Sequence, residues 1–283
     1  MIKPKSISEN LMYSTLILKS GNYQATGFIY STPHNNLVVI ANRHFAEQTD
    51  EFDFSRTKLN NTVQSIFHLS DGTNKTVNGT VTWFLHPSED LAFFPLEQLL
   101  NPIVPLIYPL TFFFGSINES IIPSIEQTEA LSASEDVTMV GYPSGIYDSI
   151  NNYPLFRYGK TASHPAVDFD GKKRGMIDVP CFPGSSGSPV LVLNEGSYHE
   201  KTGTLVIGSR VFLLGVEAAM PIRHNMVKQI KKNPSTGVIE LDKSGNEILL
   251  DTNFVVVDDL SLGYYIKASE ILKFNSVFTA LGI

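Results

Sequence analysis

Short apolar runs, separated by polar and turn-forming residues, recur along most of this chain of 283 residues. Runs that are rich in β-branched and aromatic residues and bounded by Gly, Pro, Asn, Asp or Ser are typical of β-strands. They cover residues 11–18, 27–30, 37–40, 62–68, 76–85, 91–94, 137–140, 190–193, 205–207, 211–216 and 253–257. The pattern therefore predicts an all-β protein.

Apolar residues at helical spacing are rare, and the best examples are residues 226–232 and 268–274. The second predicts a short helix close to the C-terminus. A stretch of about 18 apolar residues, which a membrane-spanning helix needs, does not occur. The positively charged first residues are not followed by the apolar segment of a secretory signal. We therefore expect no membrane partner and a cytoplasmic location.

A glycine-flanked serine stands in a tight turn just before the apolar run 190–193. The turn reads Gly-Ser-Ser-Gly, and its second serine is Ser186. A serine hydroxyl becomes a useful nucleophile only when a base removes its proton and N–H groups stabilise the oxyanion that it creates. Gly184 permits a strained turn in which its own N–H and that of Ser186 point to one spot. The turn alone is also compatible with an ordinary loop.

Two segments upstream supply the side chains that such a serine needs. His44 follows the apolar run 37–41, and Asp90 opens the run 91–94. In a catalytic triad Ser186 would attack a carbonyl carbon, His44 would take its proton, and Asp90 would orient and stabilise the imidazole. A single histidine or aspartate beside a strand is usually structural. The three motifs together, in the order His44, Asp90, Ser186, indicate a triad.

With these motifs the chain resembles the chymotrypsin-like serine peptidases, and within them the bacterial HtrA-type and related trypsin-like peptidase domains. The glycine-bearing segment 25–28, the segment 137–145 and the closing segment 262–274 are also similar. The resemblance implies an all-β fold of two antiparallel β-barrels with a short C-terminal helix. The active site would lie in the cleft between the barrels.

The resemblance also implies a domain organisation. We expect the first barrel over residues 10–115, carrying His44 and Asp90, and the second over residues 125–275, carrying Ser186. Residues 222–255 have no counterpart in the resemblance and are expected to be an insertion.

Eight residues are implied to line the pocket that receives P1, the residue before the scissile bond. They are Pro180, Cys181, Phe182, Pro183, Glu217, Ala218, Ala219 and Tyr265. Trypsin has an acidic residue at the base of this pocket, whereas Pro180 stands there, so we expect no strong preference for Arg or Lys from that position. Glu217 could recruit a basic P1 residue if it pointed inward. Alternation along a half-exposed strand favours a solvent-facing side chain at 217 instead.

A second departure from the family concerns activation. In many digestive relatives an aspartate precedes the nucleophile and pairs with a new N-terminus that cleavage creates. Ser185 occupies that position here, and an uncharged serine cannot anchor an ammonium group. We therefore expect Gly184 and Ser186 to form the oxyanion hole without N-terminal processing.

Composition and charge narrow the range of partners. The net charge of −7 and the pI of about 5.5 argue against a nucleic-acid-binding surface. The single cysteine, Cys181, cannot form an intramolecular disulfide. Most secreted animal relatives have several disulfides, so one cysteine favours a bacterial or intracellular chain. One cysteine and scattered histidines give no metal-ligand spacing, and we expect neither a metal nor a cofactor.

The sequence therefore predicts a serine endopeptidase that hydrolyses protein or peptide substrates through an acyl-enzyme. The alternative is a catalytically silent or latent module of the same fold that binds partners within an intracellular assembly. The unassigned segment 222–255 leaves room for such a protein partner. Labelling of Ser186 by a reagent specific for active serines separates the two.

Overall fold

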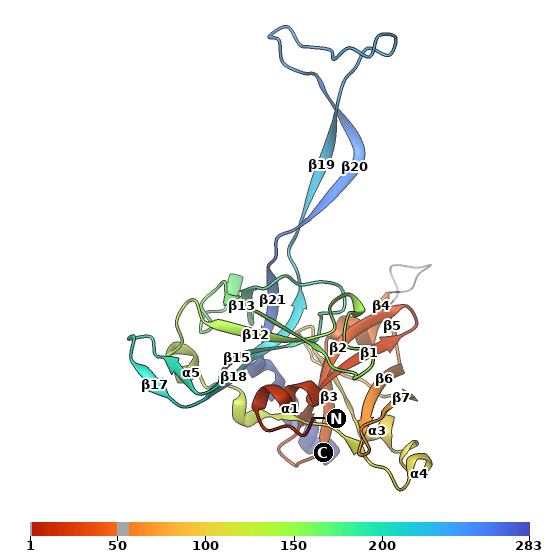
Figure 1. Ribbon diagram of the computed structural model, residues 1–283, viewed down its shortest axis with the longest axis vertical. Helices are drawn as coiled ribbons and strands as arrows, with labels where there is room; N and C mark the ends of the chain where they lie inside the picture. Colours follow the sequence, from red (N-terminus) through yellow and green to blue (C-terminus); the bar gives the residue numbers. More distant parts are fainter. Residues whose placement is uncertain (1, 50–56) are drawn as a thin grey trace.

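A β-sheet, a closed β-barrel and a long hairpin make up the computed structural model, which describes residues 2–49 and 57–283 (Figure 1). The N-terminal sheet has nine strands, and its main path is β10-β6-β1-β2-β3-β9-β8, with β7 beside β6 and β11 beside β2. These strands are β1 (Thr15–Ser20), β2 (Tyr23–Ser31), β3 (Leu37–Ala41), β6 (Thr62–Leu69), β7 (Asn74–Thr80), β8 (Phe84–Leu85), β9 (Ala92–Pro95), β10 (Phe112–Phe113) and β11 (Ile117–Asn118).

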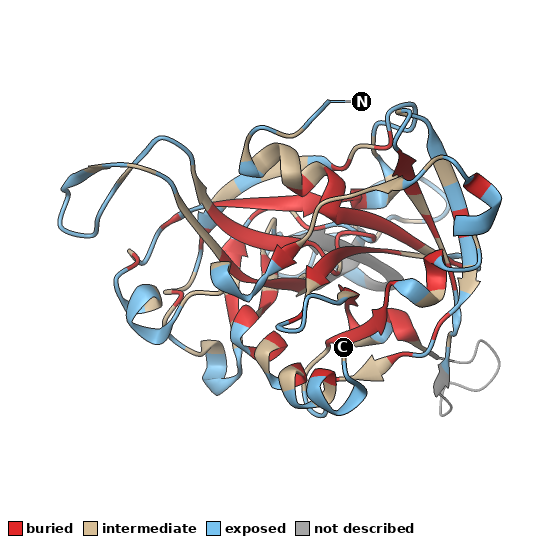
Figure 2. Ribbon diagram, turned by 90° about the horizontal axis from the view of Figure 1, so that it is seen from below, coloured by how far each residue is buried: buried red, intermediate tan, exposed pale blue. Residues whose placement is uncertain are grey.

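Both faces of this sheet are buried, which explains why its strands read as continuous apolar runs. Ile29 and Val39 pack into one core, whereas their neighbours Phe28 and Ile40 pack into another on the opposite face. Successive side chains of a strand point to opposite faces, so a strand covered on both sides needs apolar residues at every position. Figure 2 shows these strands buried through the middle of the molecule.

A closed barrel of six antiparallel strands forms most of the C-terminal half, as the resemblance implies. Its order is β12-β13-β14-β21-β18-β15. The strands are β12 (Asp136–Gly141), β13 (Leu155–Thr161), β14 (Arg174–Asp178), β15 (Pro189–Asn194), β18 (Arg210–Ala219) and β21 (Gly263–Lys267). In the N-terminal half the described strands follow the sheet path above, and a second barrel stays a prediction.

The sheet, the barrel and the C-terminal helices share one buried cluster. Phe28 comes from the sheet, Val216 from the barrel, and Phe274 and Phe278 from the chain end. The last two lie on η4 (Ala268–Phe274) and α6 (Asn275–Leu281). The predicted C-terminal helix is therefore confirmed, and it holds the two halves together.

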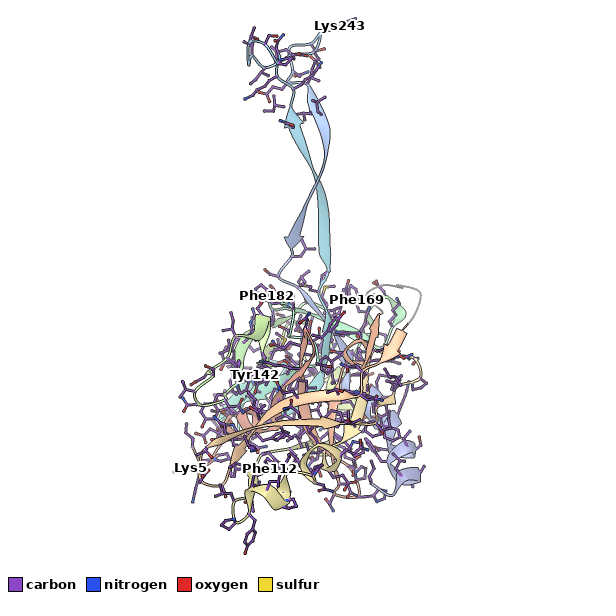
Figure 3. The ribbon with its side chains drawn as sticks, turned by 90° about the vertical axis from the view of Figure 1, so that its right-hand side faces the viewer. Lys5, Phe112, Tyr142, Phe169, Phe182 and Lys243 are labelled. Carbon is purple, nitrogen blue, oxygen red and sulfur yellow. The ribbon has the colours of Figure 1, made fainter. Side chains whose placement is uncertain are left out.

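A two-stranded arm projects from the body between β18 and β21 (Figures 1 and 3). It consists of β19 (Ile222–Ile230) and β20 (Leu249–Asp259), paired antiparallel, with Lys243 near its far end. Residues 226–230, which show apolar residues at helical spacing, belong to β19 and pair with β20. A run of seven residues is too short for its period to separate helix from strand, and the partner strand lies far along the chain.

The first four residues of the predicted strand 11–18 belong to a helix instead. A capping box at Ser6 and Glu9 begins α1 (Ile7–Ser14), and β1 starts only at Thr15. The remaining elements are α2 (Arg43–Ala46), β4 (Glu47–Thr49), β5 (Thr57–Leu59), α3 (Glu97–Leu100), α4 (Val104–Ile107), η1 (Glu119–Ile121), α5 (Ile125–Glu129), η2 (Pro143–Gly145), η3 (Phe169–Gly171), β16 (Ser197–His199) and β17 (Leu205–Ile207). Within the described residues, no helix has the length and apolar character to cross a membrane.

Candidate active site

His44 and Asp90, which are distant in sequence, form a two-point contact. His44 Nδ1 lies 2.6 Å from Asp90 Oδ2, and the backbone N–H of His44 donates to Asp90 Oδ1 at 2.8 Å. The carboxylate thus fixes both the backbone and the ring of His44, and it favours the tautomer with its proton on Nδ1. His44 Nε2 then carries a lone pair that can accept a proton.

Residues beside His44 hold the aspartate turn in place. Asn42 is fully buried, and its Nδ2 donates to the Asp90 carbonyl at 2.9 Å. Arg43 makes a bidentate pair with Glu47 at 2.7 and 3.1 Å and donates to the His86 carbonyl at 3.2 Å. Short helix α2 follows β3 directly, so a buried strand delivers all three contacts.

The turn that contains Ser186 is fastened to strand β2 of the sheet. Thr26 N–H donates to the Ser186 carbonyl at 2.8 Å, and Thr26 Oγ1 donates to the Gly184 carbonyl at 2.8 Å. Gly187 has a φ of +91°, and a Cβ there would lie 1.8 Å from the Thr26 carbonyl oxygen. Glycine is therefore required at 187 both for its backbone conformation and for the close approach of two chains.

Along this turn, N–H groups that donate a hydrogen bond alternate with N–H groups that have no backbone acceptor among the described residues. Ser185 N–H donates to Phe182 O, and Gly187 N–H donates to Glu217 O, both at 2.8 Å. Within residues 2–49 and 57–283, the N–H groups of Gly184 and Ser186 have no backbone acceptor. Gly184 also has a φ of +91°. Two unpaired donors that flank one residue are what an oxyanion needs.

The hydroxyl of Ser186 is only partly covered by its surroundings. It makes no hydrogen bond to His44 within the described part of the chain. Such bonds are often long in the absence of substrate and tighten when it binds. The structure therefore joins His44 to Asp90, and it leaves the link from Ser186 to His44 as a prediction.

The side chain of Ser185 forms a hydrogen bond within its own turn. Its side chain is buried, and Oγ accepts the Phe182 N–H at 3.2 Å. The N-terminal segment lies elsewhere, where Ile2 contacts Tyr153 and the first turn of α1 meets Glu195. The hydrogen bond of Ser185 fits a turn that needs no ammonium group from a processed N-terminus, and this stays a prediction.

Glu217 is buried, so the expectation of a solvent-facing side chain is wrong. Only 2% of the residue is exposed. Its backbone pairs with the Ser186 turn, because Gly187 N–H donates to its carbonyl and its own N–H donates to the Ser188 carbonyl. Burial raises the pKa of Glu217 to about 7, against the lowering effects of a hydrogen bond from Cys181 and of the charges on His44 and Arg157. The carboxyl group thus lies within electrostatic reach of His44.

Opposing effects act on the pKa of His44. The partial desolvation of this half-exposed ring lowers the pKa, but the hydrogen bond and charge of Asp90 and the charge of Glu217 outweigh it and raise the pKa above the usual value. A raised pKa makes the imidazole a stronger base once it is neutral.

The expected pocket residues divide into an inner and an outer group. Cys181, Glu217 and Tyr265 are buried, and Glu217 is the β-sheet partner of Tyr265. The other five are partly or fully exposed: Pro180, Phe182, Pro183, Ala218 and Ala219. The Arg157 guanidinium stacks over the Phe182 ring at 4.9 Å, and Phe182 lies on the part of the body from which the arm projects (Figure 3).

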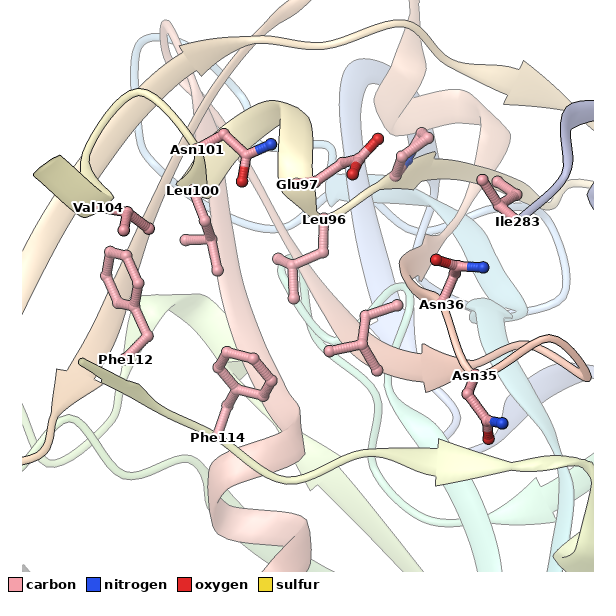
Figure 4. Close-up of a pocket in the computed structure, with 12 residues that line it drawn as sticks. Asn35, Asn36, Leu96, Glu97, Leu100, Asn101, Val104, Phe112, Phe114 and Ile283 are labelled. Atoms are coloured by element: carbon pink, nitrogen blue, oxygen red, sulfur yellow. The ribbon is translucent and has the colours of Figure 1, made fainter.

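The larger of two cavities in the molecule is not the one beside His44 and Asp90. A depression of about 290 Å³ is lined by Arg43, His44, Glu47, Ser88, Glu89 and Asp90. A larger one of about 440 Å³ has Leu100, Phe112 and Ile283 among its lining (Figure 4). None of the predicted triad residues lines the larger cavity. Among the described residues, no group of three or more His, Cys, Asp and Glu could hold a metal ion.

Sequence reasoning missed four residues that shape the site: Thr26, Asn42, Arg43 and His86. Asn42 and Arg43 precede His44 directly, so their place in the sequence could have indicated that they help to build the site. The contact of Thr26 with the Ser186 turn joins segments that are distant in sequence, and no local sequence pattern predicts it.

The profile of the trypsin-like peptidase domain matches residues 25–198, which is more than half of the chain. No curated protein sequence shows significant similarity.

Solved structures that match the chain include Rv3671c from M. tuberculosis H37Rv in an inactive form, with 15% identity and a TM-score of 0.46 over 97% of this chain and 90% of that one. The thermostable serine protease AL20 from an extremophilic microorganism has 10% identity and a TM-score of 0.46, with 96% and 99% covered. A Glu endopeptidase has 15% identity and a TM-score of 0.43, with 94% and 90% covered.

Proposed function

Because the chain belongs to the trypsin-like peptidase family, we propose that it is a serine endopeptidase with His44, Asp90 and Ser186 as its triad. The observation that carries this proposal is the contact of His44 Nδ1 with Asp90 Oδ2 at 2.6 Å. It leaves His44 Nε2 free to act as a base. The family supports a peptidase, and the assignment of individual residues is ours.

The proposed reaction begins with attack of Ser186 Oγ on the carbonyl carbon of the scissile bond. His44 Nε2 takes the hydroxyl proton, and the N–H groups of Gly184 and Ser186 stabilise the oxyanion of the tetrahedral intermediate. When the C–N bond breaks, His44 returns the proton to the leaving amine, and an acyl-enzyme remains. Water, deprotonated by His44, then attacks the ester carbon and releases the acid and Ser186.

The proposed organisation places the two halves of the chain on either side of the cleft. Residues 10–115 supply His44 and Asp90, residues 125–275 supply Ser186, and residues 222–255 are an insertion. The sheet of residues 10–115 would be the counterpart of the family's first barrel. Contacts of Thr26 with the Ser186 turn support a site at this junction.

The proposed P1 pocket consists of the inner and outer groups described above, with Pro180 at its base in place of an acid. The buried carboxyl of Glu217 makes a basic P1 residue the competing possibility. Peptides that vary only at P1, compared between the wild type and Glu217→Gln, distinguish the two. A preference for Arg or Lys that disappears in the variant would assign it to Glu217.

Covalent labelling tests the proposed function directly. A fluorophosphonate should modify the wild-type protein once, at Ser186, and should leave Ser186→Ala unmodified. His44→Ala should slow labelling by at least about a hundredfold, because the base is lost. Ser188→Ala is the matched control, since Ser188 lies in the same turn and is fully buried. Labelling at another serine, or none under native conditions, would reject the proposed triad.

A further inference from the structure

The turn that carries Asp90 is closed around one buried histidine. His86 is fully buried, and its Nδ1 accepts the N–H of Glu89 at 2.9 Å and the N–H of Ser88 at 3.3 Å. The backbone N–H of His86 donates to the Leu91 carbonyl at 2.8 Å. The imidazole therefore serves as the acceptor that holds residues 86–91 in their conformation.

These contacts determine the tautomer of His86. A nitrogen that accepts N–H donors must carry a lone pair, so in the neutral ring the proton resides on Nε2. Within the described residues, Nε2 has no hydrogen-bond partner closer than the Glu270 carboxylate, whose Oε2 lies 3.5 Å away. Glu270 is 2% exposed and lies on η4 at the far end of the chain. Lys273 Nζ lies 2.6 Å from the same oxygen.

We propose that Glu270 is a positioning residue, which receives the His86 Nε2 proton in a hydrogen bond and thereby holds the Asp90 turn against His44. Through this pair, the C-terminal helical segment takes part in building the triad. The effect of this positioning on catalysis rests on the proposed function.

The path from Glu270 to His44 consists of direct contacts. Glu270 faces His86, His86 shapes the turn, and the turn presents the Asp90 carboxylate to His44. Arg43 closes the path, because its Nη1 donates to the His86 carbonyl while its backbone continues into His44. Phe274 packs edge-on against the His86 ring at 5.4 Å, which limits rotation of the imidazole.

The Asp90 turn keeps its conformation only while the His86 ring is neutral, because Nδ1 must accept the N–H groups of the turn. A protonated ring would place an N–H at Nδ1, opposite the N–H groups of Ser88 and Glu89, and the turn would open. Four charged groups act on the ring: Glu270 and Lys273 from η4, Glu89 from the turn and Arg43 from α2. Burial has the largest effect and lowers the pKa of His86, so the ring stays neutral at neutral pH.

Nitrogen-15 NMR on histidine-labelled protein tests the proposal without relying on proteolysis. In the wild type, His86 should be neutral with its proton on Nε2, and this measurement needs no variant. Glu270→Met, which is similar in size but is a poor acceptor, should lower the His44 pKa towards the ordinary value of about 6.5. It should also slow fluorophosphonate labelling by about tenfold or more, since small misplacements of catalytic groups are costly.

Two controls separate positioning from a general loss of packing. Glu270→Gln keeps an acceptor for Nε2, so its labelling rate and its His44 pKa should stay close to those of the wild type. Ile271→Val trims a buried side chain on the same segment, and it should lower the melting temperature without changing the His44 pKa.

A proton on Nδ1 of His86, or an unchanged His44 pKa in Glu270→Met, would overturn the inference. If Glu270→Met fails to fold, the wild-type tautomer and the Glu270→Gln variant still decide. If Ser186 is never labelled while the His44 pKa responds to Glu270, the proposed function fails and the positioning role stands.

Discussion

Glu217 places a second carboxyl group behind the pair of His44 and Asp90. Its backbone is tied to the Ser186 turn, because Gly187 N–H donates to the Glu217 carbonyl at 2.8 Å. Burial raises the pKa of Glu217 to about 7, and the charge of Glu217 in turn raises the pKa of His44. The two groups therefore titrate in the same pH range, and their ionisations are coupled.

The pH dependence of activity should report this coupling. His44 must be neutral to accept a proton, so kcat/KM should fall as the pH falls through its pKa. Since that pKa is raised, the midpoint of the acid limb should lie above the ordinary imidazole value of about 6.5. Glu217→Gln removes one negative charge near the ring and should move the midpoint to lower pH. The profile of kcat/KM against pH, measured on a small ester substrate, checks this.

Asp136→Asn is the matched control for charge, because it removes an exposed carboxylate from the same barrel. Its acid limb should coincide with that of the wild type. Stability gives a second, independent measure. The pKa of Glu217 is raised in the folded state, so its ionisation should destabilise the fold as the pH rises from about 4.5 to about 7. The melting temperature of Glu217→Gln relative to the wild type should rise over that interval, and a constant difference would contradict the assignment.

At the scale of elements, the Ser186 turn depends on its contact with β2. A Cβ at Gly187 would meet the Thr26 carbonyl oxygen at 1.8 Å. Gly187→Ala must therefore push the turn away from β2 and disturb the N–H groups beside Ser186. We expect a loss of about 2–5 kcal/mol in the free energy of unfolding, from backbone strain and overpacking together. Labelling of Ser186 should slow by about a hundredfold or more.

Gly196→Ala provides the comparison for this substitution. Gly196 has a φ of +95°, close to that of Gly187, but a Cβ there meets nothing within 4 Å. It should cost only the strain of the left-handed conformation, about 1–2 kcal/mol, and leave labelling unchanged. Equal losses in the two variants, measured by urea unfolding, would show that backbone conformation alone requires glycine at 187.

The elements that the sequence predicts are those that depend on local patterns, whereas contacts between distant segments could not be predicted. The strands, the closed C-terminal barrel and the C-terminal helix follow from local apolar runs and from the resemblance. The helical spacing of residues 226–232 extends over too few residues to indicate an element, and β20, the strand that pairs with β19, lies further along the chain. Asp90 was predicted from its place before a strand, whereas its support by His86 and Glu270 joins segments 184 residues apart.

Glu217 illustrates the same limit. Alternation along one strand predicts which residues share a face, but it cannot say which face another segment covers. Glu217 is buried where its strand pairs with both the Ser186 turn and β21, and both pairings depend on the closed barrel.

At the scale of the whole molecule, the body and the arm are stabilised in different ways. The body has three buried clusters, one of which spans both halves and the C-terminal helices. The arm is a two-stranded ribbon that extends away from this body (Figure 1). Near its far end Val238, Leu241 and Leu249 are exposed by 63%, 56% and 52%. An isolated two-stranded ribbon is at best marginally stable in water, so we expect it to contribute little to the stability of the body.

Removal of the arm tests this division. Ile222 and Asp259 are β-sheet partners at its base, so a short Gly-Ser-Gly turn in place of residues 223–258 can join them. Strands β18 and β21 remain paired through Val216 with Ile266 and Glu217 with Tyr265, and the barrel stays closed. The melting temperature should change by no more than about 3 °C, which corresponds to roughly 1 kcal/mol at this size. Labelling of Ser186 should stay within about twofold of the wild-type rate, because the turn is fastened to β2 and β18 rather than to the arm. A large fall in melting temperature would instead make the arm part of the folding unit, and residues 222–255 would no longer count as an insertion.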